Sequence, residues 1–229
     1  MRLAILSDIH EDYESLLKIV GLAEARGFDK LICLGDISGF SRPYYNYEKS
    51  RNASACLALL REKCDIIIAG NHDLHAAGLS PDLPEEMKDQ ETWQHELDLD
   101  PGYNEKDISF LASLPANEII QTPDLSILFS HYVYPNLSGF VKGFYSTSKE
   151  FQAHFSFMQE HNCKLSFTGH AHPWGFYRVE SRAFKFYRRR AIKITSFPAL
   201  IGIPPATRHE HRSSFCIFDT DSLRLQVLR

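Results

Sequence analysis

Polar residues able to bind a metal ion follow five apolar stretches of this sequence, each at the point where the stretch ends. The candidate donors are Asp8, His10, Asp36, Asn71, His131, His170 and His172. No cysteine is among them, which argues against a structural zinc site built from thiolates. Mixed carboxylate and imidazole donors suit Mn²⁺, Fe²⁺, Zn²⁺ or Ni²⁺. Seven donors exceed the needs of one four-coordinate ion and fit two ions that share a bridging carboxylate, the usual arrangement for displacement at phosphorus.

The apolar stretches before these donors are typical of buried strands. Residues 3–6, 31–34 and 66–69 are continuously apolar, and two helical patterns separate them. Asp12 is placed to cap the first helix and Gly27 to end it, whereas the second helix follows Ser50. Strands that alternate with helices predict a parallel sheet built from crossover units. Because ligands of such sheets bind beyond the carboxyl ends of the strands, we expect all five loops to face one crevice.

The rest of the chain predicts a second, hairpin-rich set of strands. We expect a short helix over 108–114, strands over 119–120 and 125–129, a helix over 147–161 and a strand over 164–168. Short β-type runs follow at 176–179, 184–187, 192–194, 215–218 and 223–228. A parallel first half and a hairpin-rich second half suggest two facing sheets with helices outside, in a single domain over 1–229. Residues 75–106 lack sustained periodicity and predict a lid or insertion over a site.

The ordered motifs carry a specific resemblance. Asp8-x-His10, Gly35-Asp36, Gly70-Asn71-His72-Asp73, His131 and Gly169-His170-Ala171-His172 resemble, in this order, the calcineurin-like metallophosphoesterases, nearest to the small bacterial phosphodiesterase branch. The match runs from residue 3 to about residue 175. It implies an α/β fold, a four-layer α-β-β-α sandwich of two facing mixed sheets, with a dinuclear metal site at the carboxyl ends of the strands.

The resemblance also implies a role for each motif residue. Asp8, His10 and His172 would hold one ion, and Asn71, His131 and His170 would hold the other. Asp36 would bridge the two ions, and His72 would be the general acid. We therefore expect hydrolysis of phosphate esters by in-line attack of a metal-bridging hydroxide, with two divalent transition-metal ions as cofactors. Manganese is preferred, with iron, zinc or nickel as alternatives.

The substrate class is less sharply predicted. Phosphodiesters come ahead of monoesters, because a monoester dianion usually calls for cationic side chains beyond the metals and no arginine pair stands in the motif loops. A phosphomonoesterase, a nucleotide pyrophosphohydrolase and an endonuclease are the alternatives among enzymes. A non-catalytic scaffold on the same fold, as in the retromer subunit that resembles this family, is the alternative outside them.

Weaker candidates and departures from the family pattern complete the prediction. Arg42 and His75 are candidates for substrate binding, although a surface role suits both. Glu11-Asp12 stand where the phosphodiesterase branch has Gly-Asn, which puts the local hydrogen bonding in doubt. The motif at Gly35-Asp36 lacks the Asp-Arg-Gly that follows it in the protein phosphatase branch. His209 and His211 would contact substrate only if their loop folded back.

Composition limits the partners. The 229 residues carry a formal charge of −4, which gives no general attraction to nucleic acid or anionic membrane. The basic run 185–190, with Arg178 nearby and aromatic residues between, could bind a polyanion, but an amphipathic hairpin with a solvated basic face is favoured. Five cysteines without a Cys-x-x-Cys pair and the absence of a membrane-length apolar run predict a cytoplasmic protein with a phosphate-ester substrate, a small molecule or nucleotide. No pattern indicates an oligomeric state.

Overall fold

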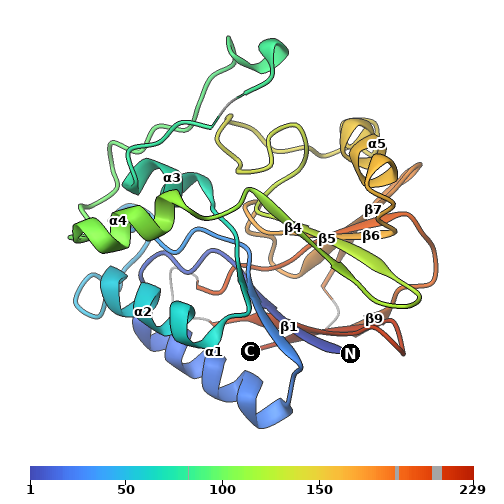
Figure 1. Cartoon of the computed structure of the whole chain (residues 1–229), viewed down its shortest axis with the longest axis horizontal. Helices are drawn as coiled ribbons and strands as arrows, with labels where there is room; N and C mark the ends of the chain where they lie inside the picture. Colours follow the sequence, from blue (N-terminus) through green and yellow to red (C-terminus); the bar gives the residue numbers. More distant parts are fainter. Residues whose placement is uncertain (82, 189–190, 208–212) are drawn as a thin grey trace.

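Two six-stranded mixed sheets face each other in the computed structural model, which describes residues 1–81, 83–188, 191–207 and 213–229 (Figure 1). The first sheet has the order β3-β2-β1-β11-β12-β9 and the second the order β4-β5-β6-β10-β7-β8. The strands are β1 (Arg2–Leu6), β2 (Lys30–Cys33), β3 (Ile66–Ile67), β4 (Asn117–Gln121), β5 (Ser126–Ser130), β6 (Leu165–Thr168), β7 (Phe176–Glu180), β8 (Ala183–Tyr187), β9 (Ala191–Lys193), β10 (Ala199–Gly202), β11 (Phe215–Asp219) and β12 (Arg224–Leu228). The helices are α1 (Tyr13–Arg26), α2 (Ala53–Lys63), α3 (Asn71–Ala76), α4 (Glu105–Ala112) and α5 (Gln152–Glu160), with a 3₁₀ turn η1 (Glu85–Met87).

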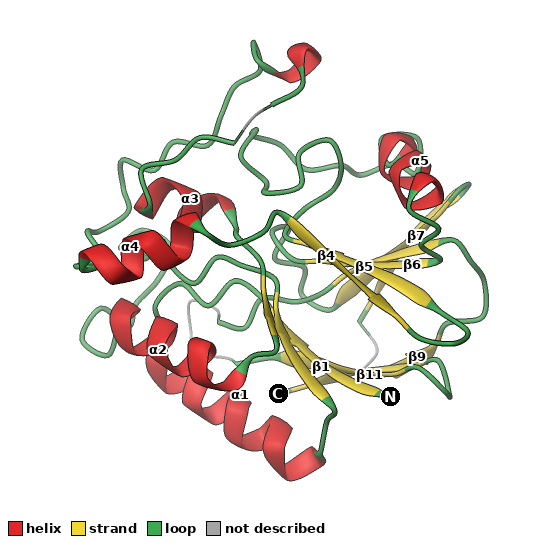
Figure 2. Cartoon of the chain, viewed as in Figure 1, coloured by secondary structure: helices red, strands yellow, loops and turns green. Residues whose placement is uncertain are grey.

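Central strands such as β1 and β2 are apolar without alternation because both of their faces are buried. On β1, Leu3 and Ile5 join the core between the two sheets, whereas Ala4 and Leu6 pack against the helices outside. Figure 2 shows α1 and α2 along the outer side of the sheet that contains β1, and α5 on the outer side of the other sheet. Leu128 of β5 packs in the same cluster as residues of α5. The predicted four-layer sandwich of two mixed sheets is confirmed.

The caps of the first two helices show how local sequence sets their limits. The Asp12 carboxylate accepts a hydrogen bond from the Ser15 N–H at 3.1 Å, and Gly27 ends α1 at φ 71°, as predicted. The second helix begins later than the pattern after Ser50 suggests. Asn52 is its N-cap, because the Asn52 side chain accepts from the Ala55 N–H at 3.0 Å.

The helix predicted over 147–161 begins only at Gln152. Glu150 is the reason, because its carboxylate accepts hydrogen bonds from the backbone N–H groups of Ser146 and Thr147 at 3.0 and 2.7 Å. The Thr147 hydroxyl donates to the same oxygen at 2.8 Å. These bonds hold residues 146–150 in a turn, and α5 starts after it.

The first three strands are parallel to one another and the later strands form hairpins, as predicted, and both sheets contain strands from the later part of the chain. β11 lies beside β1, antiparallel, with Ala4 opposite Ile217. β10 was not predicted, because Pro198 precedes its four residues and the run looks like a loop. It lies inside the second sheet, parallel to β6 and antiparallel to β7.

The segment 75–106 lies at the end of the sandwich where β1 and β2 end. It begins within α3, contains η1 and reaches the first two residues of α4, and its other described residues are loop (Figure 1). Isolated bridges join Ser41 to Asp98 and Thr92 to Val141, so its second half is tied to two other loops. No helix in the described part of the chain is long and apolar enough to cross a bilayer.

The basic run 185–190 starts in β8, which forms an antiparallel hairpin with β7. Arg178 is buried, its guanidinium donates to Ser196, and it pairs with Glu180 at 2.6 Å, so it takes no part in a solvated basic face. Lys185 and Arg188 are exposed. Arg189, Arg190, His209 and His211 lie outside the described residues.

Candidate metal centre

Left-handed backbone conformations mark the loops that carry the predicted ligands. Eight non-glycine residues in the described part of the chain have positive φ, and five of them are predicted ligands: Asp8, His10, Asp36, His170 and His172. Such conformations cost free energy for residues with a Cβ and persist where the surroundings impose them. Here the loops after β1 and β2 impose them on each other, since the N–H groups of Ile9 and His10 both donate to the Asp36 carbonyl, at 2.7 and 3.0 Å.

The first group of donors comes from the loops after β1 and β6. The Nε2 atom of His172 lies 3.1 Å from Oδ1 of Asp8 and 3.3 Å from Nε2 of His10. The other ring nitrogen of His10 faces the carbonyls of Ser38 and Gly39 at 3.1 and 3.2 Å. A proton on that nitrogen leaves the Nε2 lone pair directed at the other two donors. The three ligand atoms lie within 4.8 Å of one another, close enough to hold one cation.

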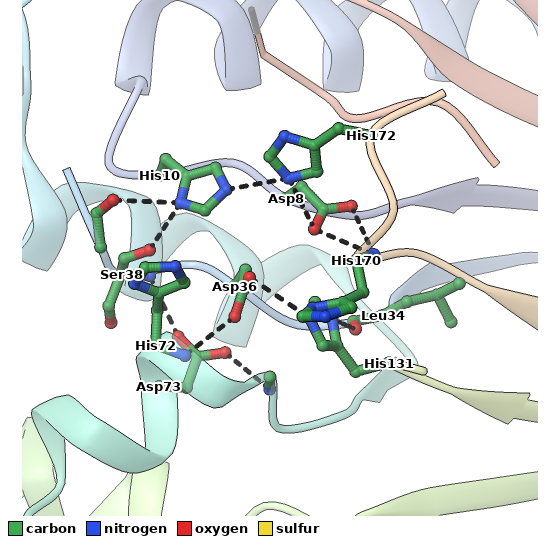
Figure 3. Close-up of polar contacts among 12 residues, drawn as sticks. Asp8, His10, Leu34, Asp36, Ser38, His72, Asp73, His131, His170 and His172 are labelled. Atoms are coloured by element: carbon green, nitrogen blue, oxygen red, sulfur yellow. Dashed lines mark hydrogen bonds and ion pairs between the residues drawn. The ribbon is translucent and has the colours of Figure 1, made fainter. Parts of the chain in front are cut away.

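The second group of donors lies on the other side of Asp36 (Figure 3). Nε2 of His131 is 3.2 Å from Oδ2 of Asp36 and 3.2 Å from Nδ1 of His170. The Nδ1 of His131 donates to the Leu34 carbonyl at 2.7 Å, which directs the Nε2 lone pair toward the carboxylate. A lone pair beside a carboxylate oxygen is repulsive unless a proton or a metal ion lies between them. This arrangement therefore fits a cation shared by Asp36 and His131.

Two buried polar atoms in the described part of the chain also indicate a cation-binding site. Oδ1 of Asn71 and Nε2 of His170 have no hydrogen-bond partner. Asn71 is the first residue of α3, and both residues line the same cavity as Asp36. Buried polar atoms usually have partners, so an unpartnered amide oxygen at a carboxylate and imidazole cluster fits a ligand for a divalent ion.

The charges of the aspartates also suit a cation. Burial alone would raise the pKa of Asp8, but the neighbouring His172 outweighs it and lowers the pKa to about 2. For Asp36, burial is likewise outweighed by His131 and His72, which hold its pKa well below the usual value. Burial, and then the nearby His72, lowers the pKa of His10 to about 3. His10 is therefore neutral beside two anionic carboxylates, as metal binding requires, whereas burial lowers the pKa of His131 but Asp36 outweighs it and raises that pKa to about 9, so a bound cation would displace a proton there.

His72 projects from the N-terminal turn of α3 beside Asp36. Its backbone N–H donates to Oδ1 of Asp36 at 3.0 Å, and its Nδ1 lies 2.5 Å from Oδ2 of Asp98. His95 contacts the same carboxylate oxygen at 3.2 Å. Burial opposes a charge on His72, but the Asp36 and Asp98 carboxylates more than compensate and raise its pKa.

Asp73 holds the loop after β2 and the start of α3 together behind the site. Its carboxylate accepts hydrogen bonds from the N–H groups of Ile37, Ser38 and Gly70, at 2.9, 3.0 and 3.1 Å. Burial, and then the nearby Asp36, raises its pKa to about 6. Gly39 has φ 94°, and a Cβ there would overlap the ring of His72, so only glycine leaves the ring its place.

A cavity of about 640 Å³ opens over these residues. Its walls include six of the eight predicted ligand and acid residues: His10, Asp36, Asn71, His72, His170 and His172. Asp8 and His131 lie beneath them, fully buried. The structure thus brings all eight to one place, at the bottom of a single cavity.

Comparison with known proteins identifies the family of this arrangement. The family model described as calcineurin-like phosphoesterase matches residues 1–174. The chain belongs to the calcineurin-like phosphoesterase family. An uncharacterized protein of Methanocaldococcus jannaschii is 23% identical over 253 residues, which cover 99% of this chain and 86% of that protein.

Two solved structures share the fold of this family member. The crystal structure of a metallophosphoesterase from Sphaerobacter thermophilus superposes with a TM-score of 0.69 at 22% identity, over 100% of this chain and 87% of that chain. A hypothetical protein from Pyrococcus horikoshii OT3 gives a TM-score of 0.67 at 14% identity, again over 100% and 87%. At these identities the likeness shows the fold alone.

The departure at Glu11 from the phosphodiesterase branch of the family has a structural role. The buried Glu11 carboxylate accepts hydrogen bonds from the N–H groups of Gly39 and Phe40, both at 3.2 Å, and pairs with Arg51 at 2.7 Å. Asp12 accepts a hydrogen bond from the Thr207 hydroxyl besides capping α1. Glu11 therefore holds the loop after β2 against the loop after β1, and Asp12 ties the loop after β1 to the segment that follows β10.

The two weaker candidates lie apart from the cavity of this phosphoesterase. Arg42 is exposed and pairs with Glu48 through two hydrogen bonds of 2.7 Å. His75 is exposed at the end of α3 and stacks on His95, with ring centroids 4.5 Å apart. Neither residue lines the cavity.

Sequence reasoning missed Asp98 and His95, which the structure places against His72. Both lie in the segment 75–106, where no periodicity or motif singles out any position. The only available signal was indirect: a general-acid histidine needs an acceptor for its second ring nitrogen, and an aspartate in a segment predicted to cover the site is a natural source.

Proposed function

We propose that this chain is a phosphodiesterase that works with two divalent transition-metal ions. In this proposal Asp8, His10 and His172 hold one ion, and Asn71, His131 and His170 hold the other. Asp36 bridges the two. The observation that carries the proposal is the position of Asp36, whose carboxylate lies within 4.8 Å of a ring nitrogen of His10 and 3.2 Å from Nε2 of His131 (Figure 3).

The bound ions would supply Lewis acidity toward a water molecule and toward the phosphoryl oxygens. The chain's own part begins with orientation: backbone carbonyls fix the rings of His10 and His131 so that their Nε2 atoms face the centre. The second contribution of the chain is to donate a proton. We propose that His72, held in its charged form by Asp36 and Asp98, donates a proton from Nε2 to the leaving oxygen.

The diester preference rests on the charge of the cavity. No lysine or arginine lines it within the ranges that the structure describes, so a substrate with one negative charge suits it better than a dianion. Manganese is the metal that we propose. The cytoplasm is the compartment that we propose, because all five cysteines are free thiols and four of them are buried.

The segment 75–106 is proposed to act as an insertion that completes the site in a single domain over 1–229. Its second half supports this role, since Trp93, His95 and Asp98 line the cavity.

Elemental analysis and two chromogenic substrates test the proposal. We expect two transition-metal ions per chain after purification with Mn²⁺, and faster turnover of bis(p-nitrophenyl) phosphate than of p-nitrophenyl phosphate. His170→Ala is expected to lose metal and activity together. The matched control His161→Ala, at an exposed histidine of the outer helix region, is expected to keep both. Less than one ion per chain with no turnover of either substrate would contradict the proposal and favour a scaffold.

A further inference from the structure

Aromatic side chains form most of the apolar wall of the cavity over the metal centre. Among the described lining residues these are Tyr44, Tyr45, Trp93, Phe144 and Trp174. Among the described lining residues, Leu97 is the only large aliphatic side chain. Both tryptophans of the protein therefore lie in this one cavity.

The aromatic rings flank the proposed ligands on two sides. The Tyr45 ring stacks on that of His10, with centroids 4.9 Å apart and planes 29° apart. On the other side, the ring of Phe144 lies 5.4 Å from that of His170, and Trp93 lies 5.5 Å from Phe144. Flat apolar surfaces thus begin at each of the two donor groups and lead outward.

The outer rings of this wall are open to solvent. Tyr44 and Trp174 are each 64% exposed, and Phe144 is 52% exposed. A soluble protein rarely keeps several large aromatic faces exposed around one concave surface unless something binds there. Their position beside the phosphate-binding centre assigns them to the organic part of the substrate.

We propose that this aromatic cavity binds a nucleobase, so that the substrate class is nucleoside phosphodiesters. The inference rests on the proposed phosphodiesterase function and names its substrate. A base offers a flat π-surface to stack on tyrosine and tryptophan rings. The side-chain amide of Gln94, which lies in the lining, offers both a donor and an acceptor for the polar edge of a base.

Two other organic groups fit the cavity less well. A quaternary ammonium group also binds aromatic rings, but here it would lie close to two divalent cations. The Asp98 carboxylate, which could offset that repulsion, is engaged by His72 and His95. An acyl chain is usually held by aliphatic side chains, which are scarce in this lining.

Tryptophan fluorescence tests the inference without any turnover. We compare adenosine 5′-monophosphate with ribose 5-phosphate, which differ only in the base, and use choline phosphate as a third ligand. We expect adenosine 5′-monophosphate to quench the fluorescence and to bind about tenfold more tightly than ribose 5-phosphate. Equal affinities of the first two ligands, or tighter binding of choline phosphate, would overturn the inference.

Two variants test whether the base binds at the aromatic wall of the cavity. Tyr44→Ala leaves both tryptophans in place and is expected to weaken adenosine 5′-monophosphate about tenfold while ribose 5-phosphate is unchanged. The matched control is Phe186→Ala, at an aromatic residue of β8 that is 47% exposed and lies outside the cavity. An equal loss for both ligands in Tyr44→Ala would assign the residue a structural role and contradict the inference.

A second comparison separates this inference from the proposed function. Thymidine 5′-(p-nitrophenyl phosphate) and methyl p-nitrophenyl phosphate share a leaving group, and we expect about a tenfold lower KM for the thymidine ester. Turnover of both with the same KM overturns the nucleobase inference and leaves the phosphodiesterase. Turnover of neither contradicts the phosphodiesterase, and the fluorescence titration then still decides whether the cavity takes a base.

Discussion

Nδ1 of His72 and Oδ2 of Asp98 are 2.5 Å apart, although the two residues lie on different segments of the chain. The contact fixes the ring so that Nε2 is the nitrogen left to meet a ligand. Asp98 is in turn held by the Ser41 hydroxyl at 2.9 Å. The orientation of His72 therefore depends on the segment 75–106, and this has consequences that can be measured.

Asp98→Asn is expected to weaken proton donation by His72. The amide removes the negative charge that favours the protonated ring, so turnover of an alkyl phosphodiester with a poor leaving group should fall about 10- to 100-fold. A p-nitrophenyl ester needs little protonation and should be affected much less. The control is Asp89→Asn, at an exposed aspartate of the same segment. Equal losses on both substrates would show that Asp98 only supports the fold.

Asn71→Ala is expected to lower the metal content from two ions per chain toward one. The substitution removes the amide oxygen that has no other partner, while Asp8, His10 and His172 are unchanged. Elemental analysis and calorimetric titration with Mn²⁺ measure the change. Asn46→Ala, at an exposed asparagine, should bind as the unchanged protein does. Two ions retained in Asn71→Ala at unaltered affinity would remove this residue from the ligand set.

Arg51→Ala is expected to destabilise the fold far more than Arg42→Ala. The side chain of Glu11 is 0% exposed and that of Arg51 17%, so removing the guanidinium leaves a buried carboxylate without its counter-charge, at a cost of about 3–5 kcal/mol. The Arg42–Glu48 pair is 65% and 46% exposed, so water and salt screen it and its loss should hardly change the free energy of unfolding.

Urea unfolding at pH 7 measures both free energies. Arg51→Met keeps much of the apolar stem and separates lost packing from lost charge. Similar small losses in Arg51→Ala and Arg42→Ala would show that Glu11 finds its stabilisation elsewhere, in the backbone N–H groups that it already accepts.

His154 predicts a pH dependence of stability away from the metal centre. Burial lowers its pKa to about 3, and in the folded protein it accepts from the Tyr134 N–H and faces the Ser166 hydroxyl. The unfolded chain takes up a proton at this histidine below about pH 6.5, whereas the folded chain does not until about pH 3. Stability from this group is therefore complete above pH 6.5 and falls as the pH drops, by up to about 1.4 kcal/mol per pH unit.

The comparison of His154→Gln with the unchanged protein isolates this contribution. The difference between their unfolding free energies should be constant above pH 7 and shrink as the pH falls from 6.5 to 4. His161→Gln, at an exposed histidine, should follow the unchanged protein at every pH. Parallel curves for His154→Gln and the unchanged protein would mean that the pKa of His154 is the same in the folded and the unfolded chain, which would contradict the prediction.

Much of the fold and of the candidate site follows from local patterns. Strands buried on both faces produce continuous apolar runs, and each run ends in the polar residues of the centre, so Asp8, Asp36 and His170 could be placed at strand ends. Asp98 and Trp93 could not, because they come from a loop with no period and reach the site only through tertiary contacts. Four-residue β10 was missed for a similar reason: its burial comes from β6 and β7, and Pro198 makes the local sequence look like a turn.

The pairing of β1 with β11 links the centre to the order in which the chain is made. Arg2 lies opposite Asp219, and β1 stands in the middle of its sheet. During synthesis β1 emerges long before its antiparallel neighbour β11, because most of the other strands and all the helices lie between them in the sequence. Such long-range pairing slows folding, because a long loop must close before the contact stabilises anything. The strand that carries Asp8 and His10 at its end thus gains its second neighbour only after β11 has been made, and a nascent chain stalled before residue 215 would lack that support for the centre.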